Sequence, residues 1–475
     1  MKNVTTIFGA PGCGKTYALM GVLSDLLKTY SPTDIAFVSF TRAGVYEGRA
    51  RAMEQFDYKV GDFPYFRTLH SIAFQHAGIK RSDVMTEARY KEFSKLVGMS
   101  FTGYYTDDMS GSDDQYLFHY FLEKNNPKMA SEYRFEGSFR VFEFVRDSYD
   151  VYKRERGYVD YTDMLDMFVE DWEALPVKVA IIDEAQDLTT LQWRMCEAAF
   201  RNCEKIFVAG DDDQAIYEWN GADVEHFMGL GGERVILDKS YRMPSKVLSF
   251  STQISARINK RIDKKFAPRE AGGQVEIING IDSLEFNESE TYYLLARNRY
   301  YLEKYAEALR KRGLVYTIKG EKSVSETLVK TINAYEYRRR EGKFKSDVDK
   351  LRVKQVLIDK EYRLPWYDAL EMDEDDKDYY RDLVANKTDL SSSNIMVSTI
   401  HGVKGGEADN VVLMADMTKR THHGYQENPD SELRVLYVGA SRAKQRLFIM
   451  PSEARYGYDD DIPLAKIVNK INRRS

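Results

Sequence analysis

The feature that most constrains this chain is a glycine-rich loop near its start, between an apolar run and a helical pattern. It matches Gly-x-x-x-x-Gly-Lys-Ser/Thr in full and consists of Gly9, Ala10, Pro11, Gly12, Cys13, Gly14, Lys15 and Thr16. A chance glycine turn could produce the spacing, but the preceding strand and the following helix are the context that phosphate binding requires. Backbone N–H groups and a helix N-terminus then converge on one anion. We expect a nucleoside triphosphate site, with Lys15 facing the β- and γ-phosphates and Thr16 facing Mg²⁺.

One member of this loop, Cys13, carries a thiol close to a helix N-terminus and to Lys15. Both neighbours favour the negatively charged form of a thiol. The sequence therefore predicts some thiolate character for Cys13, with alkylation blocking nucleotide binding and bound nucleotide protecting the thiol.

A pair of carboxylates ends a later apolar run, at Asp183 and Glu184. An acid pair at a strand end is common by itself, but beside a phosphate loop it has a chemical use. Asp183 can reach the metal through its water shell, and Glu184 can polarise the attacking water. We therefore assign Asp183 to the metal site and Glu184 to catalysis.

Short apolar runs alternate with helical patterns along most of the chain, which is typical of an α/β fold with parallel sheets. The expected strands are 4–8, 35–40, 177–183, 205–209, 234–237, 274–278, 291–296, 314–318, 394–400, 410–414 and 446–450. A polar, aromatic-rich stretch and a charged stretch interrupt the two series. The predicted domains are 1–71 with 159–238, a mainly helical insertion at 72–158, 239–324 with 393–475, and a short helical insertion at 325–392.

Composition and charge exclude several classes of protein. Hydrophobic residues make up 43% and charged residues 30%, which excludes a wholly disordered chain. The net charge of −6 excludes a globally basic nucleic-acid coat but permits a basic channel. The three cysteines include no Cys-x-x-Cys pair, which argues against a disulfide scaffold and a zinc site on adjacent thiolates. No apolar run reaches the roughly 18 residues that would span a membrane. We expect a reducing cytoplasm.

Further motifs follow the phosphate loop in a fixed order. They lie at 39–43, 67–71, 161–165, 183–188, 208–223, 240–242, 398–407 and 435–443. In this order they resemble the motif series of UvrD/Rep-type superfamily 1 DNA helicases. The resemblance covers residues 4–450 apart from the two insertions. It implies two RecA-like P-loop domains with ATP between them and single-stranded DNA bound across both.

The resemblance also implies catalytic roles for three residues beyond Lys15 and Glu184. Gln214 follows a predicted strand and can reach the γ-phosphate. Arg242 and Arg442, both expected in the second α/β half, would neutralise charge on the transferred phosphoryl group. Either arginine, taken alone, would more often be a surface residue.

Three residues are expected to contact the rest of the nucleotide. Tyr241 can stack on adenine, and Tyr17 stands where the family commonly has an arginine beside the base, so it can stack as well. Glu407 resembles the family's ribose-contacting glutamate, with an exposed acid as the alternative.

The residues expected to contact DNA are Phe40, Thr68, His70, Tyr217, Trp219 and His401. Aromatic faces bind single-stranded bases without reading sequence. Core packing is the alternative for the aromatic residues, and helix capping is the alternative for Thr68.

The resemblance thus implies an ATP-dependent single-stranded DNA translocase and DNA helicase that moves 3′ to 5′, with ATP and Mg²⁺ as cofactors. Its expected partners are single-stranded DNA, junctions of single- and double-stranded DNA, and replication or repair proteins. We expect a monomer in the cytoplasm of a bacterial or phage-infected cell. Two alternatives stay open: an RNA helicase of the same superfamily, and an ATP-switched loading or remodelling factor. The short second insertion, 325–392, keeps the latter open.

Overall fold

The computed structural model describes residues 1–475 except 2, 40–41, 57, 107–110, 134, 172–173, 359–361, 386–389, 391–392 and 474–475, and leaves the side chains of 42, 43, 47, 51, 55 and 56 undescribed. The chain divides into two compact units, each built from several segments. Unit 1 comprises Met1–Met243, Ile254–Glu270 and Asn428–Tyr437, and unit 2 comprises Pro244–Gln253, Ala271–Glu427 and Val438–Ser475.

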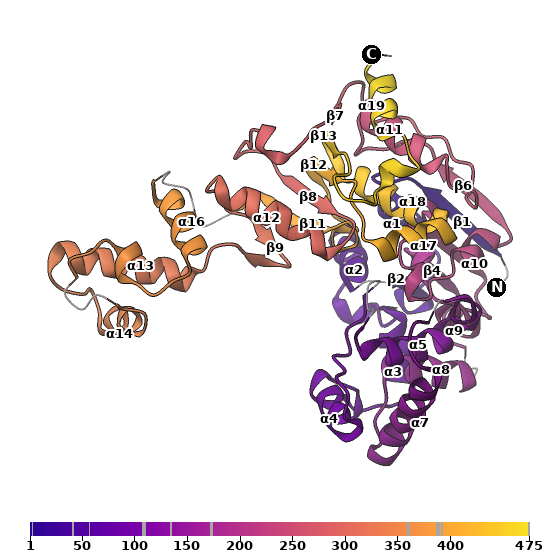
Figure 1. Ribbon diagram of the computed structural model, residues 1–475. Coiled ribbons are helices and arrows are strands. Elements are labelled where there is room, and N and C mark those ends of the chain that lie inside the picture. The colour runs from indigo at the N-terminus through magenta and orange to yellow at the C-terminus, as the bar shows by residue number, and fades with distance from the viewer. Residues whose placement is uncertain are drawn as a thin grey trace. The chain divides into compact units, whose positions relative to one another are not determined.

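Unit 1 contains a parallel sheet with six strands among the described residues, in the order β3-β2-β4-β5-β1-β6 (Figure 1). In chain order the strands are β1 (Val4–Gly9), β2 (Ile35–Ser39), β3 (Phe66–Arg67), β4 (Val179–Asp183), β5 (Lys205–Gly210) and β6 (Glu233–Leu237). The accompanying helices are α1 (Lys15–Leu26), α2 (Arg42–Phe56), α3 (Leu69–His76), α8 (Tyr161–Asp171), α9 (Thr190–Ala199) and α10 (Val224–Gly229).

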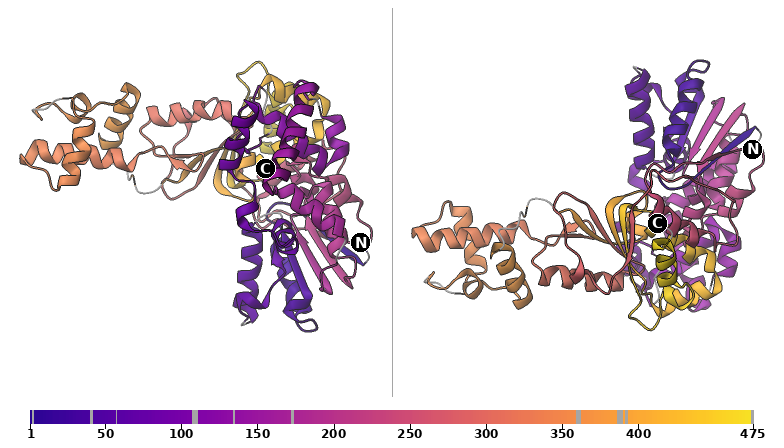
Figure 2. Two further views of the ribbon diagram at one scale, coloured as in Figure 1. Left: turned by 90° about the horizontal axis from the view of Figure 1, so that it is seen from below. Right: turned by 90° about the horizontal axis from the view of Figure 1, so that it is seen from above.

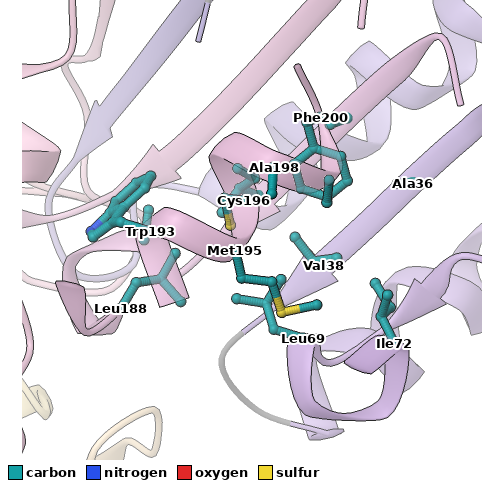
Figure 3. Close-up of a cluster of buried hydrophobic side chains, with 14 of the residues drawn as sticks. Ala36, Val38, Leu69, Ile72, Leu188, Trp193, Met195, Cys196, Ala198 and Phe200 are labelled. Atoms are coloured by element: carbon teal, nitrogen blue, oxygen red, sulfur yellow. The ribbon is translucent and has the colours of Figure 1, made fainter. Parts of the chain in front are cut away.

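Alternate strand residues of unit 1 enter two different cores. Ile35 and Phe37 join the cluster that includes residues of α1 and α2, whereas Ala36 and Val38 join the cluster that includes residues of α3, α8 and α9. Figure 3 shows part of the second cluster, where Met195 lies beside Leu69 and Val38. This alternation follows from the period of two in a strand, and it explains why the central strands are apolar on both faces.

The chain between α3 and α8 is helical and has its own aromatic core. Its helices are α4 (Glu87–Val97), α5 (Asp114–Asn125), α6 (Pro127–Glu132) and α7 (Phe139–Arg156). Figure 1 labels α4, α5 and α7, and Figure 2 shows the molecule from two further directions. Phe93, Phe142 and Tyr149 are buried in the core that α4, α5 and α7 share, whereas Ala130 of α6 belongs to a smaller cluster with Phe118 and Leu122.

Unit 2 contains a second sheet, with seven strands among the described residues, in the order β10-β9-β11-β8-β12-β13-β7. All of its pairings are parallel except that of β10 with β9. The strands are β7 (Gln274–Ile277), β8 (Tyr292–Ala296), β9 (Thr317–Ile318), β10 (Glu321–Lys322), β11 (Ile395–Thr399), β12 (Ala408–Met414) and β13 (Ala443–Met450). The helices of this unit outside the insertion are α12 (Leu302–Lys311), α17 (Lys419–Glu427) and α19 (Leu464–Asn472). Two further helices are divided between the units: most of α11 (Ser245–Ser255) belongs to unit 2, and most of α18 (Pro429–Ala440) belongs to unit 1. The predicted α/β fold with two parallel sheets is confirmed.

The second insertion forms a small helical group of its own. It contains α13 (Glu326–Glu341), α14 (Asp347–Gln355), α15 (Trp366–Ala369) and α16 (Glu374–Ala385) (Figure 1). Tyr335, Trp366 and Leu383 share its core. Among the described residues of both units, no helix combines the length and apolar character that crossing a bilayer requires.

Candidate active site and nucleic-acid interface

The phosphate loop lies between the end of β1 and the start of α1, as its sequence predicted. Gly12 and Gly14 adopt φ values of 70° and 81°, a region that favours glycine. A Cβ on Gly9 would lie only 2.2 Å from the Sγ of Cys13, so this position has no room for a side chain. The Nζ of Lys15 donates to the carbonyl of Gly9 at 3.0 Å. The lysine is thereby held over the loop whose N–H groups are expected to bind phosphate.

Lys15 lies in a strongly negative environment. Burial works against its charged form, but attraction to Cys13 and to the carboxylates of Glu184, Asp211 and Asp183 outweighs this effect and raises the pKa of the ammonium. The charge of Lys15 therefore persists at neutral pH and above. The same interactions show that all three carboxylates lie close enough to Lys15 to affect its pKa.

The thiol of Cys13 behaves differently from the expectation. It is buried, and burial raises the pKa of Cys13 despite the opposing attraction of Lys15. The predicted thiolate character is therefore wrong. The motif correctly indicated the charged neighbour, but it contained no information on how completely the loop encloses the sulfur.

The carboxylate pair follows β4 in an unusual backbone conformation. Asp183 is buried at the end of the strand, and Glu184 has a φ of 53°, in the left-handed region. Such a conformation in a residue other than glycine costs about 1–3 kcal/mol and is concentrated at functional sites. The N–H of Glu184 donates to Oδ1 of Asp183 at 2.9 Å, and Nε2 of Gln186 donates to the carboxylate of Glu184. The general-base candidate is thus fixed at both its backbone and its side chain.

Gln214 belongs to the same buried network. It lies in the short turn Asp212–Gln214 after β5, and its Nε2 donates to Oδ2 of Asp211 at 2.8 Å. The N–H of Asp211 donates to Oε1 of Gln186 at 3.1 Å. Because Gln186 also bonds Glu184, one chain of hydrogen bonds joins the expected γ-phosphate contact to the expected base.

The segment Ser240–Arg242 packs directly on the phosphate loop. The Oγ of Ser240 donates to the carbonyl of Pro11 at 2.9 Å, and the N–H of Tyr241 donates to the carbonyl of Gly12 at 2.7 Å. A Cβ on Gly12 would lie 2.3 Å from the Cβ of Arg242. Arg242, which we expected in the second α/β half, is grouped with unit 1.

Two exposed tyrosines flank the loop. Tyr17 is 78% exposed and Tyr241 is 63% exposed. A Cβ on Gly14 would lie 3.7 Å from the Cβ of Tyr17 and 4.0 Å from Cε2 of Tyr241. The Nζ of Lys239 lies over the ring of Tyr241, 5.3 Å from its centroid. A base could therefore stack on Tyr17 or on the opposite face of Tyr241.

Arg442 and Glu407 are near neighbours in unit 2. Arg442 is buried, and its guanidinium donates to the carbonyls of Val438 and Gly406 at 2.9 and 3.2 Å. Glu407 follows Gly406 and is exposed, with its carboxylate 3.9 Å from the Nζ of Lys444. The two residues that the family resemblance assigned to ATP binding in this unit are thus neighbours, because Arg442 bonds the residue that precedes Glu407.

Unit 1 also contains a hollow of about 620 Å³, lined by residues of α2, β3, α3, α8 and the chain before α4. Thr68 and His70, both expected to contact DNA, lie in its wall. The ring of Tyr161 meets His70 edge-on with the centroids 5.6 Å apart, and Tyr161 is 55% exposed. Burial lowers the pKa of His70 to about 4, so this imidazole is neutral at physiological pH.

The charged lining of this hollow was missed in the sequence. Arg49, Arg67 and Arg81 are among the described residues in its wall, together with Tyr46 and Tyr161. The sequence did contain a signal for this lining. Arg67 and Tyr161 lie within the motifs at 67–71 and 161–165, and Arg49 follows the motif at 39–43 by about two helical turns. Positive charge interleaved with aromatic rings is the combination that binds single-stranded nucleic acid.

The other expected DNA contacts have mixed positions. The Oγ1 of Thr68 accepts a hydrogen bond from the N–H of Ser71 at 3.3 Å and caps α3, so the capping alternative holds while its side chain also lines the hollow. Phe40 lies outside the described residues. His401 begins a short turn in unit 2 and is half-buried. Its contact with DNA stays a prediction.

Tyr217 and Trp219 do not line this hollow. Trp219 is half-buried, and its ring stacks on Phe118 of the helical insertion with the centroids 6.0 Å apart. Burial, reinforced by Asp187 and Glu184, raises the pKa of Tyr217 to about 12. The ring contact favours packing for Trp219, and the carboxylates of Asp187 and Glu184 lie close enough to Tyr217 to affect its pKa. DNA stacking by either residue stays a prediction.

Comparison with known proteins places these sites in context. A family model described as the UvrD/REP helicase N-terminal domain matches residues 1–233, and one described as the UvrD-like helicase C-terminal domain matches 380–454. ATP-dependent DNA helicase Rep of Buchnera aphidicola is 21% identical over 355 residues, covering 66% of this chain and 52% of the relative. DNA helicase II of Escherichia coli is 23% identical over 296 residues, covering 58% and 41%. The chain thus spans about half, or less, of the length of these curated relatives.

Proposed function

Because the chain belongs to the UvrD/Rep helicase family, we propose that it is an ATP hydrolase that translocates along single-stranded DNA and separates DNA strands. The observation that carries the proposal is the buried hydrogen-bond chain from Glu184 through Gln186 and Asp211 to Gln214, beside a complete phosphate loop. A phosphate-binding loop alone would suit many nucleotide-binding proteins. A fixed base linked to a fixed γ-phosphate contact suits hydrolysis.

In this proposal, Lys15 and the loop N–H groups bind the triphosphate, and Glu184 orients and deprotonates the attacking water. Thr16 and Asp183 provide the hard oxygen donors that Mg²⁺ prefers, and the ion would neutralise phosphate charge there. Tyr17 and Tyr241 contact the base.

Arginine and ribose contacts complete the proposed ATP site. Arg242 lies against Gly12 in unit 1, where it can approach the phosphates. Arg442 and Glu407 are proposed as the second arginine and the ribose contact. Both arginines would act on the charge of the transferred phosphoryl group.

We place single-stranded DNA in the hollow of unit 1, with its phosphates near Arg49, Arg67 and Arg81 and a base against Tyr161. Movement is proposed to run 3′ to 5′. The proposed substrates are single-stranded DNA and junctions with duplex, handled by a monomer during replication or repair. Bases can stack on aromatic rings without sequence preference, as a translocase requires.

Two substitutions in the hollow should weaken DNA binding in different ways. Tyr161→Ala should cost about 1–3 kcal/mol of single-stranded DNA binding and leave the salt dependence unchanged, because a stacking contact is lost. Arg49→Ala should make the salt dependence shallower, with the negative slope of log K against log salt reduced in magnitude by about 0.7, because one phosphate contact is lost. Fluorescence titrations at several salt concentrations measure both effects. Tyr104→Ala and Arg154→Ala, which change exposed residues outside the hollow, are the matched controls. Equal effects in variant and control would remove the hollow from the DNA path.

The overall proposal is tested by measuring ATP hydrolysis with no polymer, with single-stranded DNA, with duplex DNA and with RNA, beside a strand-separation assay. We expect the largest stimulation by single-stranded DNA, with strand separation from a 3′ single-stranded tail. Preferential stimulation by RNA would indicate an RNA helicase. Stimulation by single-stranded DNA without strand separation would indicate a loading or remodelling factor.

A further inference from the structure

A buried cluster of charges lies immediately behind Gln214 in unit 1. The side chains of Asp211, Asp212 and Asp213 are fully buried, and so is that of Lys264. The Nζ of Lys264 lies 2.8 Å from Oδ1 of Asp211 and 3.2 Å from Oδ2 of Asp213, and it also bonds the carboxylate of Asp212. A second cation, Arg261, makes two hydrogen bonds to Asp213, at 2.9 and 2.7 Å.

The charges of this cluster depend on one another. Burial opposes the charge of Lys264, but the attraction of the three carboxylates outweighs it and raises the pKa of the ammonium above its usual value. A buried charge whose partner is removed is strongly destabilising, so every member is constrained by the others. Replacing a buried charge cluster by well-packed apolar residues is often neutral or stabilising, so stability alone does not account for the cluster. The groups that the cluster holds in position are the better explanation.

Lys264 and Gln214 bind opposite oxygens of the same carboxylate. Oδ1 of Asp211 accepts from Nζ of Lys264, and Oδ2 accepts from Nε2 of Gln214, both at 2.8 Å. The contact with Lys264 holds the rotation of the carboxylate together with the N–H of Asp213, which donates to Oδ1 at the longer distance of 3.3 Å. The bond at Oδ2 passes that orientation to the amide of Gln214. The side chains of Arg261 and Asp213 bond each other, and neither makes a hydrogen bond to the carboxylate of Asp211. Asp213 contacts Asp211 through its main-chain N–H, and an asparagine at this position keeps that bond.

We propose that Lys264 is a positioning residue, which acts through Asp211 to hold the amide of Gln214 in the orientation that contacts the γ-phosphate. The proposal rests on the role of Gln214 in the proposed function. Lys264 itself is separated from the nucleotide by Asp211 and takes no part in the chemistry. Its expected effect is therefore on turnover rather than on nucleotide affinity.

The test uses the full chain with Lys264→Met combined with Asp212→Asn, which removes one positive and one negative charge together. We expect kcat for DNA-stimulated ATP hydrolysis to fall about tenfold while KM for ATP changes less than about twofold. The matched control is Arg261→Met with Asp213→Asn, which removes the other buried pair of the same cluster. Its kcat should stay within about twofold of wild type, and melting temperatures should show whether the two pairs lose similar stability. Equal losses of kcat in the two pairs would overturn the positioning role.

A mutant cycle with Gln214→Ala separates this inference from the proposed function. If Lys264 acts through Gln214, the Lys264 pair should lower kcat by less than about twofold when Gln214 is already alanine. If the Lys264 pair lowers kcat in the Gln214→Ala background by the same factor as in the wild-type background, the positioning role is overturned and the role of Gln214 is unaffected. Wild-type kcat in Gln214→Ala alone would overturn both. If the Lys264 pair melts below the assay temperature, Lys264→Arg, which keeps the charge but displaces the donor, replaces it in the cycle with the same expected signs.

Discussion

We expect Lys15→Ala to abolish ATP hydrolysis, with kcat under saturating single-stranded DNA at least about 100-fold below wild type. The physical reason is the charge balance of the loop. Lys15 lies among the carboxylates of Asp183, Glu184 and Asp211, which would otherwise face the phosphates without a compensating charge. Because those carboxylates also raise the pKa of Lys15, its charge is present throughout the neutral range in the wild-type protein, and titration of this lysine should not limit hydrolysis there.

The control for this substitution is Lys28→Ala. Lys28 follows the same helix, is exposed and pairs with Asp25 at the surface. Its loss should leave both kcat and the melting temperature near wild type, since exposed pairs contribute about 0–1 kcal/mol. A Lys15→Ala protein that melts normally and hydrolyses ATP at more than about a tenth of the wild-type rate would contradict the assigned role.

Helices and strands could be predicted from the sequence where an apolar pattern extended over enough residues. The run 177–183 predicted β4, observed at Val179–Asp183, because five consecutive buried residues admit few other structures. The expected strand 314–318 is reduced to Thr317–Ile318, which turns back at once into the antiparallel β10. The two-residue β3 was missed, because two residues carry no periodicity.

The candidate site was predictable to the extent that its residues are local in sequence. The phosphate loop and the pair Asp183–Glu184 are continuous segments whose geometry follows from the strand before them. The state of Cys13 was not predictable, because its burial depends on surrounding atoms. The burial and the contacts of Lys264 were the hardest features to predict, because the basic stretch around it in the sequence has the composition of a solvated surface. Only the fold brings it against Asp211 and buries it.

Glu184→Gln should leave ATP binding intact and lower hydrolysis by about 10²–10⁴-fold, because it removes the base and preserves the shape. Glutamine tolerates the φ of 53° no worse than glutamate, and the bond from the N–H of residue 184 to Asp183 does not involve the altered side chain. The amide oxygen of the new side chain can still accept from Nε2 of Gln186. The structure of the nucleotide-bound state should therefore persist while turnover stops.

The measurements are equilibrium binding of ATP and the rate of phosphate release under saturating single-stranded DNA. Glu197→Gln, which neutralises a carboxylate of α9 that lies 3.8 Å from Nε2 of His226, should leave both unchanged. Because the protein should be held in its ATP-bound state, single-stranded DNA should dissociate from Glu184→Gln at a rate that no longer depends on hydrolysis. Near-wild-type phosphate release would show that water is activated elsewhere, and loss of ATP binding would show that Glu184 shapes the nucleotide pocket rather than the reaction.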